Sequence, residues 1–203
     1  MNLQFISNGP ALLIRNRQKI LVIADLHFGI ESDLAMHGWH LASRSAERLE
    51  RLCACITTNS PDLLILLGDV KHSIPKTTRQ EYREIPDLIA AIRNLVPFRI
   101  LPGNHDIGIG RFLNEGELLP KGGVIIDGVG FIHGHTTPAP DLLGHLIIAG
   151  HHHPMVCLYA STSSLDGSGT WSRCFLSSAW SRWAELDAKL GEMWRDECGK
   201  AGI

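Results

Sequence analysis

The sequence predicts an α/β fold, and three features of the chain support this prediction. In the first half, short apolar runs alternate with amphipathic helical patterns, which is typical of parallel strands joined by right-handed crossovers. In the second half, short apolar runs follow one another closely, which is typical of antiparallel strands. The length of 203 residues, with 44% hydrophobic and 20% charged residues, fits one globular domain, which we expect to span residues 1–203.

The first half is predicted to begin with a β-hairpin, because the strong turn sequence Ser7-Asn8-Gly9-Pro10 separates two apolar runs. Lys19 to Ala24 is a short β-branched apolar run of the kind found in strands that are buried on both faces. Apolar residues at three- and four-residue spacing predict two amphipathic helices further along. The expected strands are 3–6, 11–14, 19–24, 62–67 and 98–101, and the expected helices cover 43–58 and 85–95.

The second half is predicted to be mainly antiparallel, since Asp127-Gly128 is a two-residue hairpin signal between apolar runs. Residues 161–170 are rich in Ser, Thr and Gly, and we expect them to form a mobile hairpin loop. The tryptophans near the C-terminus are expected to pack against the core; these are Trp180, Trp183 and Trp194. The expected strands are 124–126, 129–132, 146–149, 155–159 and 173–176.

Composition argues against several classes of protein. Nineteen Lys and Arg against 21 Asp and Glu give a formal net charge of −2, without the basic footprint of a typical nucleic-acid-binding domain. Five cysteines, an odd number without a CxxC pair, favour a reducing compartment over a disulfide framework or a thiolate zinc site. The chain shows neither a secretory signal pattern nor an apolar run of about 18 residues, so we expect a cytoplasmic protein without membrane contact.

Polar residues follow three of the predicted strands directly, at the positions where ligands bind in open α/β sheets. The three segments are Asp25-Leu26-His27, Gly68-Asp69 and Gly103-Asn104-His105-Asp106. Two further histidine clusters follow strands of the second half, His133-Gly134-His135 and Gly150-His151-His152-His153. Because the carboxyl ends of parallel strands meet at one edge of a sheet, we expect these loops to converge.

Alternation in an extended chain is expected to direct Asp25 and His27 toward one ion, with Leu26 turned into the core. The same argument pairs His151 with His153 and leaves His152, like His135, outside the ligand set. The candidate metal ligands are therefore Asp25, His27, Asp69, Asn104, His133, His151 and His153.

Such a ligand set is too large for one tetrahedral zinc ion and suits two five- or six-coordinate ions that share a carboxylate, for which Asp69 is the natural candidate. Since the set contains no thiolate, Mn²⁺, Fe, Zn²⁺, Ni²⁺, Co²⁺ and Mg²⁺ are all chemically admissible. We expect two divalent ions, with Mn²⁺ as the first to test.

These motifs, in this order, resemble those of the calcineurin-like metallophosphoesterase superfamily: D-x-H, G-D, G-N-H-D, H-G and G-H-x-H. The resemblance implies a four-layer α/β/β/α sandwich of two mixed sheets flanked by helices, and phosphoester hydrolysis by a metal-activated hydroxide. It assigns Asp25, His27, Asp69 and His153 to one ion, and Asp69, Asn104, His133 and His151 to the other. The chain is also similar to small stand-alone members, among them archaeal phosphoesterases and nucleases associated with DNA ligase.

The residues beside the ligands are candidates for catalysis and substrate binding. His105 is expected to stabilise the transition state or to protonate the leaving oxygen, and Asp106 is expected to orient its ring. Lys71, His72 and Arg79 are the candidate contacts to the substrate phosphate, while Arg83 and Arg111 also lie near the motif loops.

Three functions are compatible with these motifs. The first is hydrolysis of phosphodiesters, with nucleic acid as a candidate substrate. The others are a phosphomonoesterase or protein phosphatase on the same site, and a metal-binding scaffold without activity. The C-terminal tryptophans also make a homodimer a candidate assembly.

Overall fold

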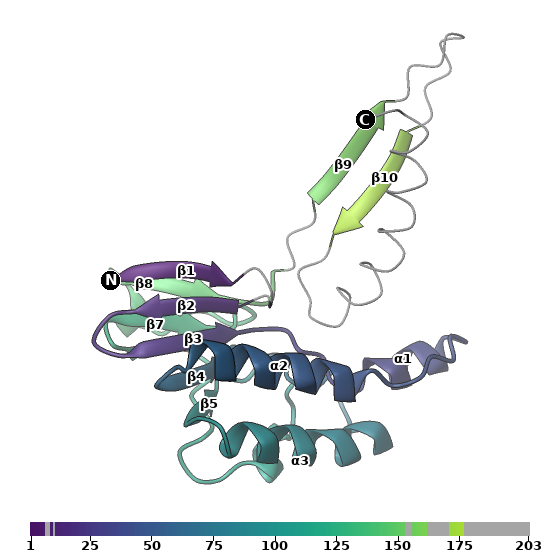
Figure 1. Cartoon of the computed structure of the whole chain (residues 1–203), viewed down its shortest axis with the longest axis horizontal. Helices are drawn as coiled ribbons and strands as arrows, with labels where there is room; N and C mark the ends of the chain where they lie inside the picture. The colour runs from purple at the N-terminus through teal and green to yellow at the C-terminus, as the bar shows by residue number, and fades with distance from the viewer. Residues whose placement is uncertain (7–8, 10, 153–155, 162–170, 177–203) are drawn as a thin grey trace. The chain divides into compact units, whose positions relative to one another are not determined.

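The structure, a computed structural model, describes residues 1–6, 9, 11–152, 156–161 and 171–176. The chain divides into two compact units, Met1–His152 and His153–Ile203. The first unit holds two β-sheets and three α-helices, α1 (Ile30–Met36), α2 (Ser45–Asn59) and α3 (Arg79–Arg93) (Figure 1). Within the described ranges, every helix is too short or too polar to cross a membrane.

The larger sheet of the first unit has five strands in the order β1-β2-β3-β4-β5. Its first three strands are antiparallel, which confirms the predicted hairpin at the start of the chain. The last three run parallel, as the alternation of strands and helices predicts. The strands are β1 (Asn2–Ile6), β2 (Ala11–Arg15), β3 (Lys19–Ile23), β4 (Leu63–Leu66) and β5 (Phe98–Ile100).

The smaller sheet has three strands, β6 (Val124–Ile126), β7 (Val129–Ile132) and β8 (Leu146–Ala149). The β6–β7 hairpin turns at Asp127-Gly128, where both residues have positive φ, as the sequence predicts. The antiparallel prediction is wrong for β8, which pairs parallel to β7. Residues 133–145, which include the 3-10 turn η2 (Pro140–Leu142), provide the crossover that a parallel pair requires.

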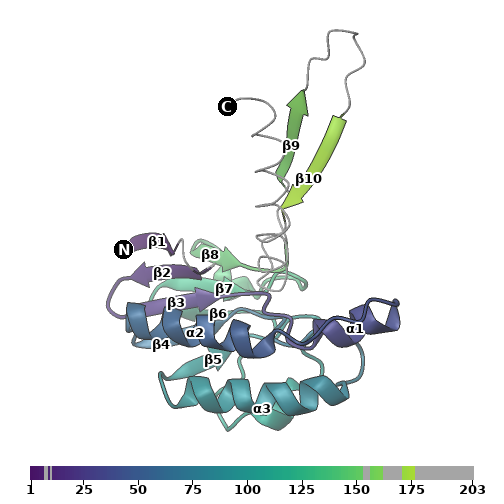
Figure 2. The same ribbon diagram turned by 45° about the vertical axis from the view of Figure 1, so that its right-hand side comes forward.

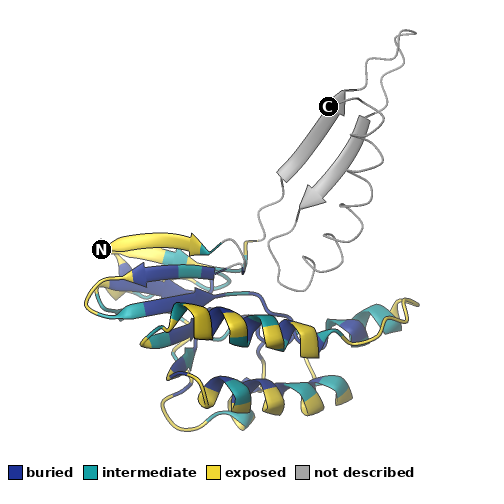
Figure 3. Cartoon of the chain, in the orientation of Figure 1, coloured by how far each residue is buried: buried dark blue, intermediate teal, exposed yellow. Residues whose placement is uncertain are grey.

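The two sheets pack against each other through a shared apolar core. Ile20 and Val22 of β3 and Ile65 of β4 lie in one buried cluster with Val129 and Phe131 of β7. Residues that alternate with them along the strands point to the opposite face, which is also buried. Helices α2 and α3 cover that face (Figures 2 and 3). The predicted α/β fold with two mixed sheets is confirmed.

Local sequence accounts for where the longer helices begin and end. Helix α3 starts with a capping box, in which Thr78 and Glu81 satisfy each other's backbone N–H groups. Helix α2 ends at Asn59, and the capping residue Ser60 adopts a left-handed conformation. Helix α1, which the sequence analysis did not predict, has only seven residues and lacks a side-chain cap.

The second unit contributes an antiparallel pair of strands, β9 (Val156–Ser161) and β10 (Trp171–Leu176), as predicted. Cys157 pairs with Phe175, and Ser161 with Trp171. Ser161, the first residue of the loop predicted over 161–170, belongs to β9, and the rest of that loop and the C-terminal tryptophans lie outside the described residues.

Candidate metal centre

The loops that follow β3 and β4 run side by side at the carboxyl edge of the large sheet. The backbone N–H of Asp25 donates to the carbonyl of Gly68 at 3.0 Å, and that of His27 to the carbonyl of Asp69 at 2.8 Å. Leu26, between the two polar residues, is buried in the core as expected. The parallel ladder thus continues past the strand ends and brings both loops together.

Four of the candidate ligands adopt left-handed backbone conformations. The φ angles are 57° at Asp25, 47° at His27, 52° at Asp69 and 67° at His151. The chain is therefore not extended at these residues, so the alternation argument gave the wrong reason for the proximity of Asp25 and His27. Left-handed backbone angles are unfavourable for residues other than glycine, and such strain concentrates at functional sites.

Asp69 lies at the centre of the cluster. Its Oδ1 accepts the backbone N–H of His105 at 2.9 Å, and its Oδ2 lies 3.4 Å from His133 Nε2 and 3.8 Å from His27 Nε2. Burial by itself raises the pKa of this carboxyl, but the contacts with His133 and His105 outweigh burial and lower the pKa to about 2. Asp69 is consequently a buried carboxylate that stays ionised.

His133, which follows β7, is fully buried, and its ring is oriented by the main chain. The Nδ1 atom lies 2.8 Å from the carbonyl oxygen of Leu67. The Nδ1 N–H is therefore held by this carbonyl, and Nε2 is the ring nitrogen that faces Asp69. This arrangement is typical of a metal-binding histidine.

The structure groups most of the predicted ligands into two triads that share Asp69. Within each triad, one ligand atom per residue lies within 4.8 Å of the others; the triads are Asp25, His27 and Asp69, and Asp69, His133 and His151. The sequence resemblance assigned the same residues to two ions. His153 lies outside the described residues.

The donor atoms fit divalent metal ions. Asn104 Oδ1 and His133 Nε2 are two of the six buried side-chain atoms without a hydrogen-bond partner among the described residues, which is costly unless another group satisfies them. Both belong to the predicted ligand set. Carboxylate and amide oxygens with imidazole nitrogens are donors that Mn²⁺, Fe and Zn²⁺ accept.

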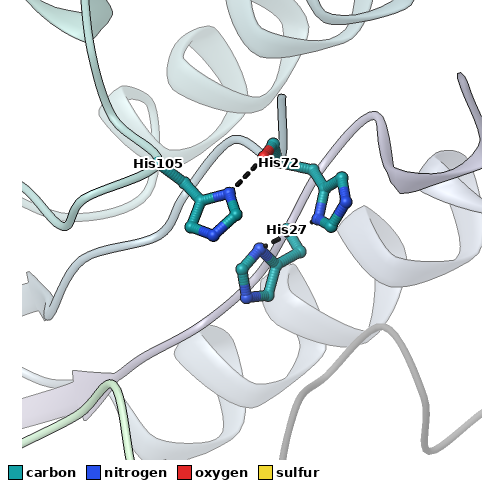
Figure 4. Close-up of side chains that lie close together, drawn as sticks. All are labelled: His27, His72 and His105. Carbon is teal, nitrogen blue, oxygen red and sulfur yellow. Dashed lines mark hydrogen bonds between the residues drawn. The ribbon is translucent and has the colours of Figure 1, made fainter. Parts of the chain in front are cut away.

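A further group of rings, His27, His72 and His105, shares His27 with the first triad; Figure 4 shows its three rings. The Nδ1 atoms of His27 and His72 are 3.2 Å apart, and the Nδ1 atom of His105 contacts the carbonyl of His72. Burial, followed by the charge of His105, lowers the pKa of His72. The sequence analysis expected His72 to contact phosphate and did not foresee its contact with a candidate ligand.

Asp33 of α1 is a neighbour of this group that the sequence analysis missed. Its Oδ2 lies 3.6 Å from His72 Nε2 and 3.6 Å from His37 Nδ1. The segment lacked a recognisable helical pattern, so no signal placed Asp33 near the motif loops.

Asp106 was expected to orient the ring of His105, but its carboxylate binds backbone N–H groups of two loops instead. Its Oδ1 accepts the backbone N–H groups of Val70 and Lys71 at 2.9 and 3.1 Å, and its Oδ2 accepts that of Gly103 at 2.8 Å. Burial raises the pKa of this carboxyl to about 6. Asp106 therefore ties the loop after β4 to the loop after β5.

Of the other two residues expected to contact the substrate, Lys71 lies in the interior and Arg79 on the surface. Lys71 is fully buried, and its ammonium group donates to the carbonyl of Ser73, so it is not presented to a substrate. Arg79 is exposed at the first position of α3.

Glu81 is a second residue that the sequence analysis missed. Its side chain is fully buried, and its Oε1 accepts the backbone N–H groups of His72 and Ser73 at 3.0 and 2.7 Å. The pattern Thr78-x-x-Glu81 could have found it, because it is a capping-box signature. Glu81 thus links the start of α3 to the loop that carries His72.

Two mixed sheets with a cluster of carboxylates and histidines at their carboxyl edge make this an α/β protein with a candidate metal centre. The family model described as calcineurin-like phosphoesterase matches residues 18–173, and the chain therefore belongs to this family. The predicted superfamily and the predicted metallophosphoesterase activity are confirmed.

Two solved structures are similar to this chain. Nuclease MPE of Pseudomonas putida shares 18% identity at a TM-score of 0.51, over 88% of this chain and 87% of that chain. The phosphoesterase Yfce from E. coli shares 16% identity at a TM-score of 0.39, over 59% of this chain and 62% of that chain. At these identities the likeness to nuclease MPE shows the fold. No curated protein matches the chain.

Proposed function

We propose that this phosphoesterase is a dinuclear-metal-dependent phosphodiesterase, with nucleic acid among its substrates. The observation that carries the proposal is the sharing of Asp69 between two triads of ligand atoms. A shared carboxylate is the arrangement that holds two ions close enough to act on one phosphoryl group. The extended structural likeness to a nuclease supports diesters as the substrate class.

The candidate ligands would form two metal sites that share Asp69. Asp25 and His27 would hold one ion together with Asp69, and Asn104, His133 and His151 would hold the other with the same carboxylate. Two bound divalent ions, Mn²⁺ in our expectation, would stabilise charge on the phosphoryl oxygens and lower the pKa of a water molecule. The Leu67 carbonyl holds Nδ1 of His133, so Nε2 is the nitrogen that would bind such an ion.

His105 is placed to act on the leaving group. Its Nδ1 is held by the carbonyl of His72, while its Nε2 lies 4.0 Å from Asp69 Oδ2, so Nε2 faces the cluster. The side chain is 23% exposed, which leaves the ring accessible to a substrate. A protonated His105 would donate its Nε2 proton to the departing oxygen, and His72 beside it would contact the phosphate.

The test is hydrolysis of bis(p-nitrophenyl) phosphate and p-nitrophenyl phosphate by metal-stripped protein to which Mn²⁺ or another divalent ion is returned. We expect activity on the diester that depends on about two bound ions per chain. His105→Ala should lower turnover roughly 10²- to 10⁴-fold without loss of metal. The exposed His145, which contacts the carbonyl of Gly128, supplies a matched control as His145→Ala.

Two results would contradict the proposal. Protein that holds two ions and cleaves neither ester would favour the inactive scaffold. A strong preference for the monoester would favour the phosphomonoesterase or protein phosphatase instead.

A further inference from the structure

Tyr82 of α3 and Arg111 of η1 (Ile109–Phe112) form an exposed pair on the first unit. The Arg111 guanidinium donates to the phenol oxygen of Tyr82, and its Cζ lies 5.6 Å from the centre of the Tyr82 ring. Tyr82 nevertheless remains 48% exposed. An aromatic ring and a cation are thus presented together to solvent.

The pair is held by its surroundings. The ring of Phe112 packs edge-on against Tyr82, with 5.9 Å between the ring centres, and Arg111 Nε donates to the carbonyl of Gly108 at 3.0 Å. Gly108 has a φ of 80°, and a Cβ there would lie closer than 3.0 Å to the Arg111 guanidinium. Since the two side chains are already ordered, a ligand that binds them loses less conformational entropy.

The pair is connected directly to both loops that carry catalytic candidates. Tyr82 follows Glu81, whose carboxylate accepts the backbone N–H of His72. Helix η1 follows the loop of His105, and the backbone N–H of Ile109 donates to the carbonyl of Asp106 at 2.9 Å. Tyr82 and Arg111 therefore adjoin, along the chain, the segments that are tied to the loops of His72 and His105.

Two further arginines lie on the same helix as Tyr82. Arg79 and Arg83 lie three residues before and one residue after Tyr82 on α3, so all three side chains occupy one face of the helix. All three are exposed. Arg111 contacts the exposed aromatic ring, and Arg79 and Arg83 lie on the same helix face as the ring, although the formal net charge of the chain is −2.

We propose that Arg79, Tyr82, Arg83 and Arg111, here called the Tyr82 surface, bind a single-stranded nucleic acid whose scissile phosphate lies at the metal centre. This inference rests on the proposed function and deepens it. Aromatic stacking combined with cationic phosphate contacts is how single strands are bound without sequence readout. A duplex keeps its bases stacked inside, so it does not offer a base to Tyr82.

The first test measures binding, which does not require turnover. Fluorescence anisotropy of labelled thymidine and uridine oligonucleotides of about 12 residues gives the Kd with metal-free protein. Tyr82→Ala should weaken binding about tenfold, while Tyr82→Trp, which keeps a stacking ring, should preserve it. Arg111→Gln should also lower the slope of log K against log salt by about 0.7. The two oligonucleotides distinguish DNA from RNA.

Matched controls come from exposed residues elsewhere on the first unit. Phe5→Ala on β1 removes an aromatic ring that is 85% exposed, and Arg15→Gln on β2 removes an exposed cation. Both should leave oligonucleotide binding unchanged. Thermal unfolding of each variant separates a binding defect from a folding defect.

The outcomes separate this inference from the proposed function. Turnover of the small diester by the wild type decides the proposed function, whereas the effect of Tyr82→Ala on oligonucleotide affinity decides the Tyr82 surface. Absent oligonucleotide binding, or binding that neither Tyr82→Ala nor Arg111→Gln weakens, would overturn the inference. The pair would then be a stabilising contact between α3 and η1.

Discussion

The carboxylate of Asp69 accepts the backbone N–H of His105 at 2.9 Å across 36 positions of sequence. The other oxygen of the same carboxylate faces the Nε2 atoms of His27 and His133. One buried side chain therefore holds the loop of the candidate proton donor and supplies negative charge to both triads. Metal binding and the position of His105 should depend on each other for this reason.

Asp69→Asn should abolish binding of both ions, because the neutral amide removes the charge that the two triads share. We expect the metal content to fall from about two ions to below one per chain, with loss of diester hydrolysis. Metal analysis of the purified variant, beside the exposed helix variant Asp87→Asn as control, measures this. An Asp69→Asn protein that still holds two ions would rule out Asp69 as the bridge.

Gly68→Ala should damage the metal centre more than Gly116→Ala, although both glycines have positive φ, 84° and 78°. A Cβ at Gly68 would lie closer than 3.0 Å to the ring of His133, whereas a Cβ at Gly116 would meet nothing within 4 Å. Each substitution costs about 1–2 kcal/mol for the left-handed backbone, but only Gly68→Ala should also displace His133. Thermal unfolding with and without Mn²⁺ tests this difference, and equal metal-induced stabilisation of the two variants would refute it.

Much of the fold could be predicted because its signals are local. The apolar run from Lys19 to Ala24 corresponds to β3, and the hairpin signal Asp127-Gly128 lies at the turn between β6 and β7. The parallel pairing of β7 and β8 could not be predicted, because residues 133–145 carry no helical pattern that marks a crossover. The short helix α1 depends on tertiary contacts of Glu31 rather than on its own propensity.

The site was predictable in composition but not in detail. The motif loops follow strand ends, so the sequence indicated which side chains meet at the sheet edge. The positive φ angles of Asp25 and His27 arise from the paired loops, which no spacing argument contains. The burial of Lys71 and the anchoring role of Asp106 likewise depend on contacts between separate loops.

Asp106→Asn should destabilise the protein by roughly 1–3 kcal/mol. In the variant, an amide NH₂ would face a backbone N–H that donates to a carboxylate oxygen in the wild type. The loops of Val70 and Gly103 should separate, which would weaken metal binding as well. Urea unfolding and a Mn²⁺ titration measure the two effects. If Asp106 instead acted only by orienting His105, turnover would fall while stability and metal affinity stayed at wild-type values.

Glu31→Gln should be among the more destabilising single changes outside the metal centre. The Glu31 carboxylate accepts two hydrogen bonds from the Arg48 guanidinium, at 2.8 and 3.2 Å, and a third from Gln80 at 2.9 Å. Both members of this pair are buried, so removal of one charge leaves the other uncompensated and should cost about 3–5 kcal/mol. Glu47→Gln at the exposed Arg44 pair is the matched control and should cost about 1 kcal/mol or less.

The dependence of this difference on pH follows from the pKa of Glu31. Burial by itself raises that pKa, but the hydrogen bonds and charge of Arg48 outweigh burial and hold it below the usual 4.5. A lowered pKa in the folded state means that the ionised carboxylate contributes stability above pH 4.5, and that this contribution is lost as the pH falls through the folded-state pKa. The stability gap between wild type and Glu31→Gln, measured by urea unfolding, should therefore be largest near neutral pH and should shrink below pH 4.5. A gap that stays constant across this range would mean that Glu31 stabilises the protein by packing rather than by its charge.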